Sequence, residues 1–245
     1  MSVFARRMSY AEAVEGRRRV GRRIAFFLLF FICFEVVSSL FITAYRSGSS
    51  SMAPTIEEDE YLLATPLAYG PRTIFGKLPW SSAPSRGDIV VADPPYARGD
   101  GFWGGMAESL LRFVSFQRLS IHRGDDPTLA GPRILRVIAL PGDRVMMEDF
   151  VYKVLPAGTE HYLTEFELSP QRYDIRRAAL PAGWTEGLPG SGSMESRLLG
   201  PKEYFVDGDS RGALGGSRLW GPIGKEQFLA KVLLRYWPFK RFGAP

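Results

Sequence analysis

The sequence predicts a mainly β protein in which one N-terminal transmembrane helix precedes an antiparallel β domain. Two observations carry this prediction. An apolar run of 21 residues, Ile24–Ala44, lies near the start of the chain, and short apolar runs separated by Gly and Pro fill the rest. The 245-residue chain is thus divided into a basic segment 1–23, a helix 24–44 and a domain 45–245.

The apolar run has the length of a membrane span, since about 20 apolar residues cross a bilayer. Seven arginines precede it and only Arg46 directly follows it, so the N-terminus is expected in the cytoplasm and the β domain outside. A cleaved signal peptide is the competing interpretation, but its apolar region should be only about 7–15 residues long. We therefore expect a retained single-pass anchor in the plasma (inner) membrane, with the lipid bilayer as a partner.

Glu35 lies near the centre of this run, where a carboxyl group should be protonated or paired. Contact with a partner helix or a passing substrate and a single tolerated polar residue are both open interpretations.

Composition argues against several functional classes. The net charge of +5 comes from the segment before residue 24, so the remainder is close to neutral and no nucleic-acid surface is expected. The single cysteine, Cys33, falls inside the apolar run, which excludes a disulfide within the chain or a cysteine-based metal site. With only two histidines, no metal site and no cofactor are expected.

The strands of the β domain are predicted from short apolar runs that end at turn residues. YLLA at 61–64 and IVVA at 89–92 are typical, and 133–148 contains two strands around a Pro-Gly-Asp turn. Further strands are expected within 203–211 and 227–238. Many short strands of this kind indicate an all-β domain.

Two segments depart from this pattern. Gly105–Leu119 has apolar residues at helical spacing, which predicts a small inserted helix, either at the membrane interface or packed on the β domain. Residues 180–200 are rich in Gly, Pro and Ser, which predicts a mobile surface loop.

Four blocks after the apolar run together resemble the conserved boxes of the type I signal peptidases. They follow in the order Ser49–Ile56 (SSSMAPTI), Arg86–Val91 (RGDIVV), Arg136–Asp143 (RVIALPGD) and Tyr204–Arg211 (YFVDGDSR). The resemblance extends from about Ser49 to Trp237. A second Ser-Met segment, Ser191–Met194, lacks the following Pro-Thr and lies in the predicted loop.

This resemblance implies a fold of the signal-peptidase type and a serine endopeptidase site. The nucleophile would be Ser51, and Ser49 would help backbone NH groups to stabilise the oxyanion. The substrate would be the signal peptide of an exported protein, bound as an added β-strand with small side chains in shallow pockets. Substrate-lining positions implied by the resemblance are Met52, Pro54 and Ile134.

The sequence departs from the family at the general base. The family has a lysine, kept neutral by desolvation, where this chain has Leu135. The serine that hydrogen-bonds that lysine is replaced by Leu214, and an aspartate that pairs with an arginine is replaced by Gly216. The last block otherwise matches the family at Gly208, Asp209, Arg211 and Arg218.

These departures predict that Leu135 and Leu214 touch each other near Ser51, as the Lys–Ser pair would. His122 is a candidate substitute base, although a surface histidine in its His-Arg-Gly-Asp-Asp turn is favoured. Lys153 and Lys202 are expected to face solvent.

Three hypotheses follow. The first is a membrane-anchored serine endopeptidase that cuts signal peptides, because Ser51 and its motif are intact. The second is a catalytically deficient homologue that binds signal peptides or partners another, active signal peptidase, because the lysine is missing. In the third, Ser51 only shapes its loop, which explains the four blocks poorly.

Overall fold

The computed structural model describes residues 10–70, 72–73, 76–77, 82–96, 131–178, 190–213 and 215–245. For residues 10–15, 35–40, 72–73 and 76–77 it describes only the backbone. The predicted inserted helix Gly105–Leu119, His122 and Leu214 lie outside the described residues, as do the side chain of Glu35 and most of the first half of the predicted loop 180–200.

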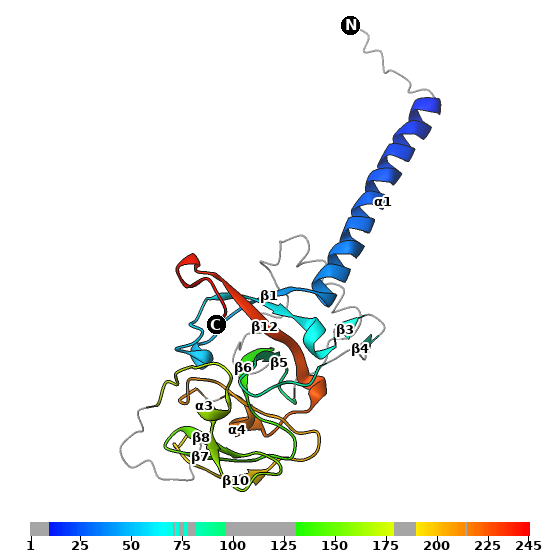
Figure 1. Cartoon of the computed structure of the whole chain (residues 1–245). Coiled ribbons are helices and arrows are strands. Elements are labelled where there is room, and N and C mark those ends of the chain that lie inside the picture. Colours follow the sequence, from blue (N-terminus) through cyan, green and yellow to red (C-terminus); the bar gives the residue numbers. More distant parts are fainter. Residues whose placement is uncertain are drawn as a thin grey trace.

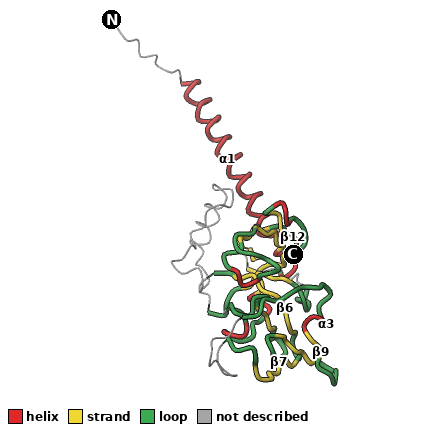
Figure 2. Tube along the Cα trace, turned by 90° about the vertical axis from the view of Figure 1, so that its left-hand side faces the viewer, coloured by secondary structure: helices red, strands yellow, loops and turns green. Residues whose placement is uncertain are grey.

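One long helix stands apart from a β-rich body. Helix α1 (Tyr10–Leu40) projects from that body and ends beside the first strand (Figures 1 and 2). It begins well before Ile24 because the preceding Glu, Arg and Ala residues favour helix. Its apolar side chains are exposed, with Phe26 at 71% and Leu29 at 60%. Among the residues whose side chains are described, no helix is both long and apolar enough to cross a membrane.

The main sheet has six antiparallel strands in the order β1-β2-β12-β5-β6-β11. The ten-residue β12 crosses the middle of the body, beside β5 and β6 (Figure 1). The strands are β1 (Thr43–Arg46), β2 (Tyr61–Thr65), β5 (Ile89–Ala92), β6 (Arg133–Ala139), β11 (Phe205–Asp207) and β12 (Phe228–Trp237). The prediction of a mainly β, antiparallel class is thus confirmed.

A second, four-stranded sheet has the order β10-β7-β8-β9 and lies below the first in Figure 1. Its β7–β8 hairpin turns at Asp149 and Phe150, both with positive φ, as tight hairpin turns require. Its strands are β7 (Arg144–Glu148), β8 (Val151–Leu155), β9 (Leu163–Thr164) and β10 (Met194–Leu198). A two-stranded ribbon is formed by β3 (Arg72–Thr73) and β4 (Gly76–Lys77).

Strand β10 corrects the prediction of a loop over 180–200. Residues 194–198 pair with β7 at the edge of the second sheet. Because four of its five side chains are exposed, β10 lacks the alternating apolar pattern that would have predicted a strand.

Among the described residues, five short helices lie between strands, and η4 follows the last strand. They are η1 (Ser50–Met52), η2 (Pro66–Tyr69), α3 (Glu165–Leu168), α4 (Ser217–Trp220), η3 (Lys225–Gln227) and η4 (Phe239–Arg241).

Two hydrophobic clusters cover opposite faces of the main sheet. Adjacent residues of one strand belong to different clusters: Ile134 packs with Met52 in the first, and Leu135 packs with Phe228 in the second. This alternation follows from the two-residue period of a β-strand. It places the start of β6 between two apolar layers, with η1 at the edge.

Candidate active site

Ser51 lies in η1, directly after β1, and its loop is held by the segment that follows β11. The Ser210 amide donates a hydrogen bond to the Ser51 carbonyl at 2.9 Å. Gly208 packs so closely that a Cβ added to it would lie 2.3 Å from the Ser51 carbonyl oxygen. Only glycine allows this approach. Ser51 is 8% exposed, so the loop sets a nearly buried hydroxyl at the edge of the sheet.

Ser49 is the hydrogen-bonding neighbour of Ser51. Its hydroxyl donates to Ser51 Oγ at 3.0 Å, and the Ser47 hydroxyl in turn donates to the Ser49 carbonyl at 3.0 Å. The structure therefore brings together the two serines that the sequence singled out. In this geometry the Ser49 hydroxyl points at the Ser51 hydroxyl, and its predicted role toward an oxyanion stays a prediction.

Leu135 occupies the place predicted for the base and is completely buried. It pairs with Val90 on β5 and belongs to the second cluster, with Val137 and Val206. The pairing of β11 with β6 ends at Asp207 and Arg136, and the next residue, Gly208, packs on Ser51. Whether the Leu135 side chain faces Ser51 stays a prediction. The predicted contact with Leu214 lies outside the described residues.

No substitute base is found in the described part of the chain. The hydrogen bond recorded at Ser51 Oγ comes from Ser49. His161 and Lys202 are exposed, and Lys153 is 38% exposed and pairs with Glu148. The prediction that both lysines face solvent is therefore confirmed for Lys202 and holds in part for Lys153.

The predicted substrate-lining residues fall on one side of the site. Met52 and Ile134 share the first cluster, and both are buried. Pro54 is half-buried, and its carbonyl accepts a hydrogen bond from Arg241 at 3.1 Å. Whether a peptide contacts these residues stays a prediction.

A buried ion pair lies on the other side of the loop. Arg136 binds Asp209 through two hydrogen bonds, Nε to Oδ1 at 2.8 Å and Nη2 to Oδ2 at 2.7 Å. Arg136 also donates to the Gly87 carbonyl and stacks on the Tyr173 ring, with Cζ 3.8 Å from the ring centroid. The Thr55 hydroxyl donates to Asp209, which ties the end of the Ser51 block to this pair. The pair is 0–1% exposed, so it is well shielded from water.

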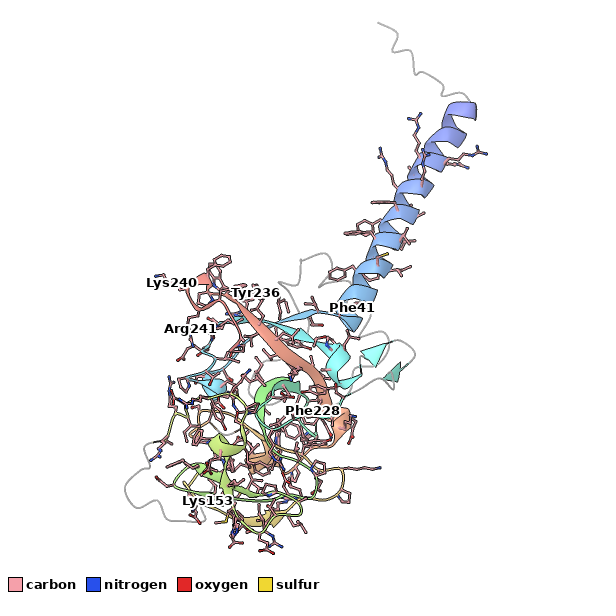
Figure 3. The ribbon with its side chains drawn as sticks, in the orientation of Figure 1. Phe41, Lys153, Phe228, Tyr236, Lys240 and Arg241 are labelled. Carbon is pink, nitrogen blue, oxygen red and sulfur yellow. The ribbon has the colours of Figure 1, made fainter. Side chains whose placement is uncertain are left out.

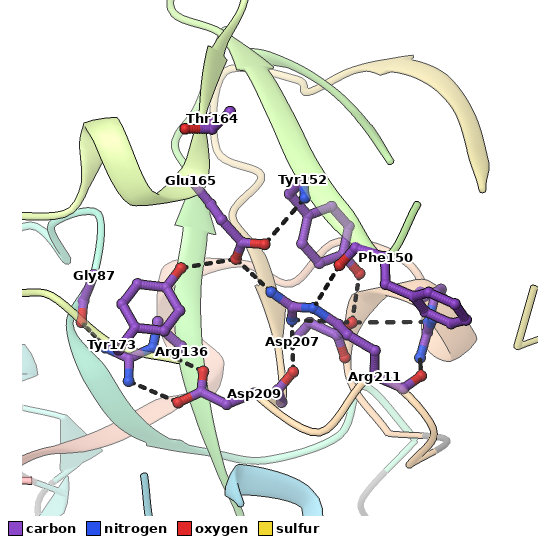
Figure 4. A network of polar contacts seen from close by, with 12 residues as sticks. Gly87, Arg136, Phe150, Tyr152, Thr164, Glu165, Tyr173, Asp207, Asp209 and Arg211 are labelled. Carbon is purple, nitrogen blue, oxygen red and sulfur yellow. Dashed lines mark hydrogen bonds and ion pairs between the residues drawn. The ribbon is translucent and has the colours of Figure 1, made fainter. Parts of the chain in front are cut away.

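A second buried pair lies beside the first, as Figure 4 shows. Arg211 pairs with Glu165 and donates to the carbonyls of Gly208 at 2.6 Å and Phe150 at 3.1 Å. Burial lowers the pKa of Arg211, but the carboxylates of Glu165 and Asp207 reverse this and raise it. Glu165 also accepts from the Tyr173 hydroxyl at 2.7 Å. Arg211 therefore keeps its charge, and its hydrogen bond fixes the Gly208 carbonyl.

Several members of this network were missed by the sequence analysis. Glu165, Tyr152 and Tyr173 lie outside the four blocks and gave no signal. Asp207 did give one, because it ends an otherwise apolar strand, Phe205–Asp207, and is 1% exposed. A charged residue in a buried strand needs partners, and these are visible only in the fold.

The antiparallel β domain thus sets the Ser51 loop against β6 and the segment after β11. The sequence matches the family described as signal peptidase, peptidase S26, over residues 19–237. This chain belongs to that family.

Two curated relatives show the extent of the similarity. The "Probable signal peptidase I-1" of Synechocystis is 25% identical over 196 residues, which are 80% of this chain and 71% of that one. The "Signal peptidase IB" of Staphylococcus aureus is 24% identical over 220 residues, 89% of this chain and 87% of that one.

Proposed function

We propose that this protein is a membrane-anchored signal-peptidase homologue that binds the signal peptides of exported proteins and cleaves them very poorly. The observation that carries the proposal is Leu135, fully buried among apolar side chains where the family has its lysine. A serine hydroxyl is a weak nucleophile without a base, and a leucine cannot accept its proton.

Peptide binding is supported by the backbone of β6. Residues Arg133–Leu135 pair with β5 on one side, whereas the pairing with β11 begins only at Arg136. Among the described strands, none pairs with the start of β6 on its β11 side. A peptide strand could add there, next to the Met52–Ile134 cluster, because strand addition uses backbone groups that Leu135 keeps.

Membrane anchoring with the N-terminus in the cytoplasm is supported by two exposed apolar regions. One is α1, whose apolar side chains are exposed above the β domain. The other is the aromatic tip after β12, where Trp237 is 46%, Phe239 74% and Phe242 61% exposed. Figure 3 shows Phe41, at the base of α1, and Lys240, at this tip, both on the upper side of the β domain. Aromatic and basic side chains together favour a bilayer interface.

The topology has a direct test. A reporter fused after Ala244 that works only in an exported compartment should be active. A reporter active only in the cytoplasm would reverse the orientation.

An active peptidase is the second candidate, because the hydrogen bond between Ser49 and Ser51 and the close packing of Ser51 on Gly208 are intact. The deciding experiment measures both binding and cleavage of a preprotein by full-length wild type and Ser51→Ala. We expect similar binding by both proteins and nearly equal, very slow cleavage. Efficient cleavage that Ser51→Ala abolishes would establish the second candidate, and failure of both proteins to bind would remove the proposed function.

A further inference from the structure

The aspartate that the family resemblance places at position 216 is missing, and the structure shows what fills the space. Gly216 has φ +120°, and a Cβ added to it would lie 2.6 Å from Asp207 Oδ1 and 2.8 Å from the Val206 carbonyl oxygen. The backbones of Asp207 and Gly216 pair in an antiparallel bridge. The Asp207 carboxylate therefore occupies the room next to position 216, and a side chain there would collide with it.

Asp207 faces the arginines of the last block. Its Oδ2 lies 3.7 Å from Arg218 Nε and 3.9 Å from Arg211 Nη1, and the Tyr152 hydroxyl donates to it. Burial raises the pKa of Asp207, while the two arginines oppose this effect. A carboxylate that is 1% exposed has to be compensated in this way.

The buried charges can be matched one by one. Arg136 pairs with Asp209 and Arg211 pairs with Glu165. Arg218 is 10% exposed in its side chain, and among the described residues the carboxylate within ion-pair distance is that of Asp207. Without Asp207, Arg218 would be a nearly buried cation with no carboxylate, which is costly.

Hydrogen bonds continue from this pair to Gly208, which packs on Ser51. Arg218 Nη2 donates to the Arg211 carbonyl at 2.5 Å, and Arg211 Nη1 donates to the Gly208 carbonyl at 2.6 Å. Gly208 packs against the Ser51 backbone. Asp207 is thus linked to Ser51 through Arg218, Arg211 and Gly208.

We propose that Asp207 has taken over the task of the aspartate missing at position 216, and that it is a positioning residue for the Ser51 loop. The inference goes beyond the proposed function, because it concerns only how the Ser51 loop is held in place. Gly216 is then a compensated exchange rather than a third sign of decay, and the loss at this site is confined to the Lys–Ser pair that Leu135 and Leu214 replace.

The first test is a double-mutant cycle on the full-length protein in detergent. Asp207→Asn and Arg218→Gln should each lower the urea midpoint of unfolding, and the double variant should lose clearly less than the sum of both. The control cycle uses the exposed pair Asp149→Asn and Arg177→Gln, 2.9 Å apart, where we expect almost no coupling. If Asp207→Asn does not fold, the double variant should still fold. Additive losses, or a double variant that also fails to fold, would overturn the proposal.

The second test asks whether the charge acts on position 51. In a Cys33→Ser, Ser51→Cys background, the pH midpoint of alkylation by iodoacetamide reports the pKa of the new thiol. Asp207→Asn should lower that midpoint by about half a unit, because Arg218 is left uncompensated, and adding Arg218→Gln should restore it. An unchanged midpoint would leave Asp207 with a structural role only and overturn the positioning role. No peptide is used, so this result is independent of signal-peptide binding.

Discussion

The two sides of the Ser51 loop differ in what they contain. On the apolar side, the second hydrophobic cluster encloses Leu135, at the position where the family resemblance implies the lysine, and the hydroxyl of Ser51 receives its hydrogen bond from Ser49. On the polar side, three arginines are matched to three buried carboxylates, and this network holds Gly208 and Thr55. The contacts that hold the Ser51 loop are present while a leucine stands at the position of the lysine, which is the arrangement that the proposed peptide-binding function requires.

The largest effect, a gain in cleavage activity, should come from introducing polar residues at positions 135 and 214. Leu135→Lys alone should help cleavage little, because its ammonium would lie in an apolar pocket without an orienting partner. Leu135→Lys with Leu214→Ser should gain much more, since loss of one member of a catalytic unit costs on the order of 10⁴–10⁶ in turnover. Preprotein cleavage by both variants, each with and without Ser51→Ala, measures this. Equal activity of the single and the double variant would show that position 214 does not serve the base.

Breaking the polar side should cost stability instead. Asp209→Asn leaves Arg136 buried without its carboxylate, so the free energy of unfolding should fall by about 3–5 kcal/mol. Urea unfolding of the full-length protein measures it. The control is Asp59→Asn, which removes an exposed partner of Arg46 and should cost at most about 1 kcal/mol. Equal losses of unfolding free energy in both variants would mean that the buried ion pair contributes no more to stability than an exposed one.

The close packing of Gly208 on Ser51 can be tested by adding one methyl group at position 208. Gly208→Ala would push against the Ser51 carbonyl, and we expect a loss of about 1–3 kcal/mol in unfolding together with weaker peptide binding. Gly48→Ala is the matched control, because a Cβ at that position meets nothing within 4 Å. Unchanged peptide binding by Gly208→Ala would show that peptide recognition does not depend on the position of Ser51.

The smallest effect should come from a carboxylate remote from both sides. Glu167 caps α3 through hydrogen bonds from the Thr164 amide and hydroxyl, which lower its pKa below the ordinary 4.5. A lowered folded-state pKa contributes stability above the ordinary value and loses it as the pH falls through the lowered value. In thermal unfolding, the stability of wild type should therefore exceed that of Glu167→Gln slightly at pH 7, and the difference should shrink as the pH falls below 4.5. A difference that grows at low pH would contradict this sign.

The sequence by itself determined the β class, the Ser51 block and the leucine at position 135, whereas its predicted helix end at Ala44 was wrong, because α1 ends at Leu40 and β1 begins at Thr43. These features are local: strand length, turn residues and a motif with fixed spacing can be read within a few positions. The sequence also predicted, without deciding between them, an active and a deficient enzyme.

Only the tertiary structure decided how the site is held together. It paired Arg211 with Glu165 across 46 positions and brought Tyr152 to Asp207 across 55, in each case joining a residue of the fourth block to one outside every recognised block. It also turned the apparent loss at Gly216 into an exchange with Asp207, and it showed β10 where a loop was expected. Such partners depend on strand register and on burial, and both are set by the whole fold rather than by any local run of residues.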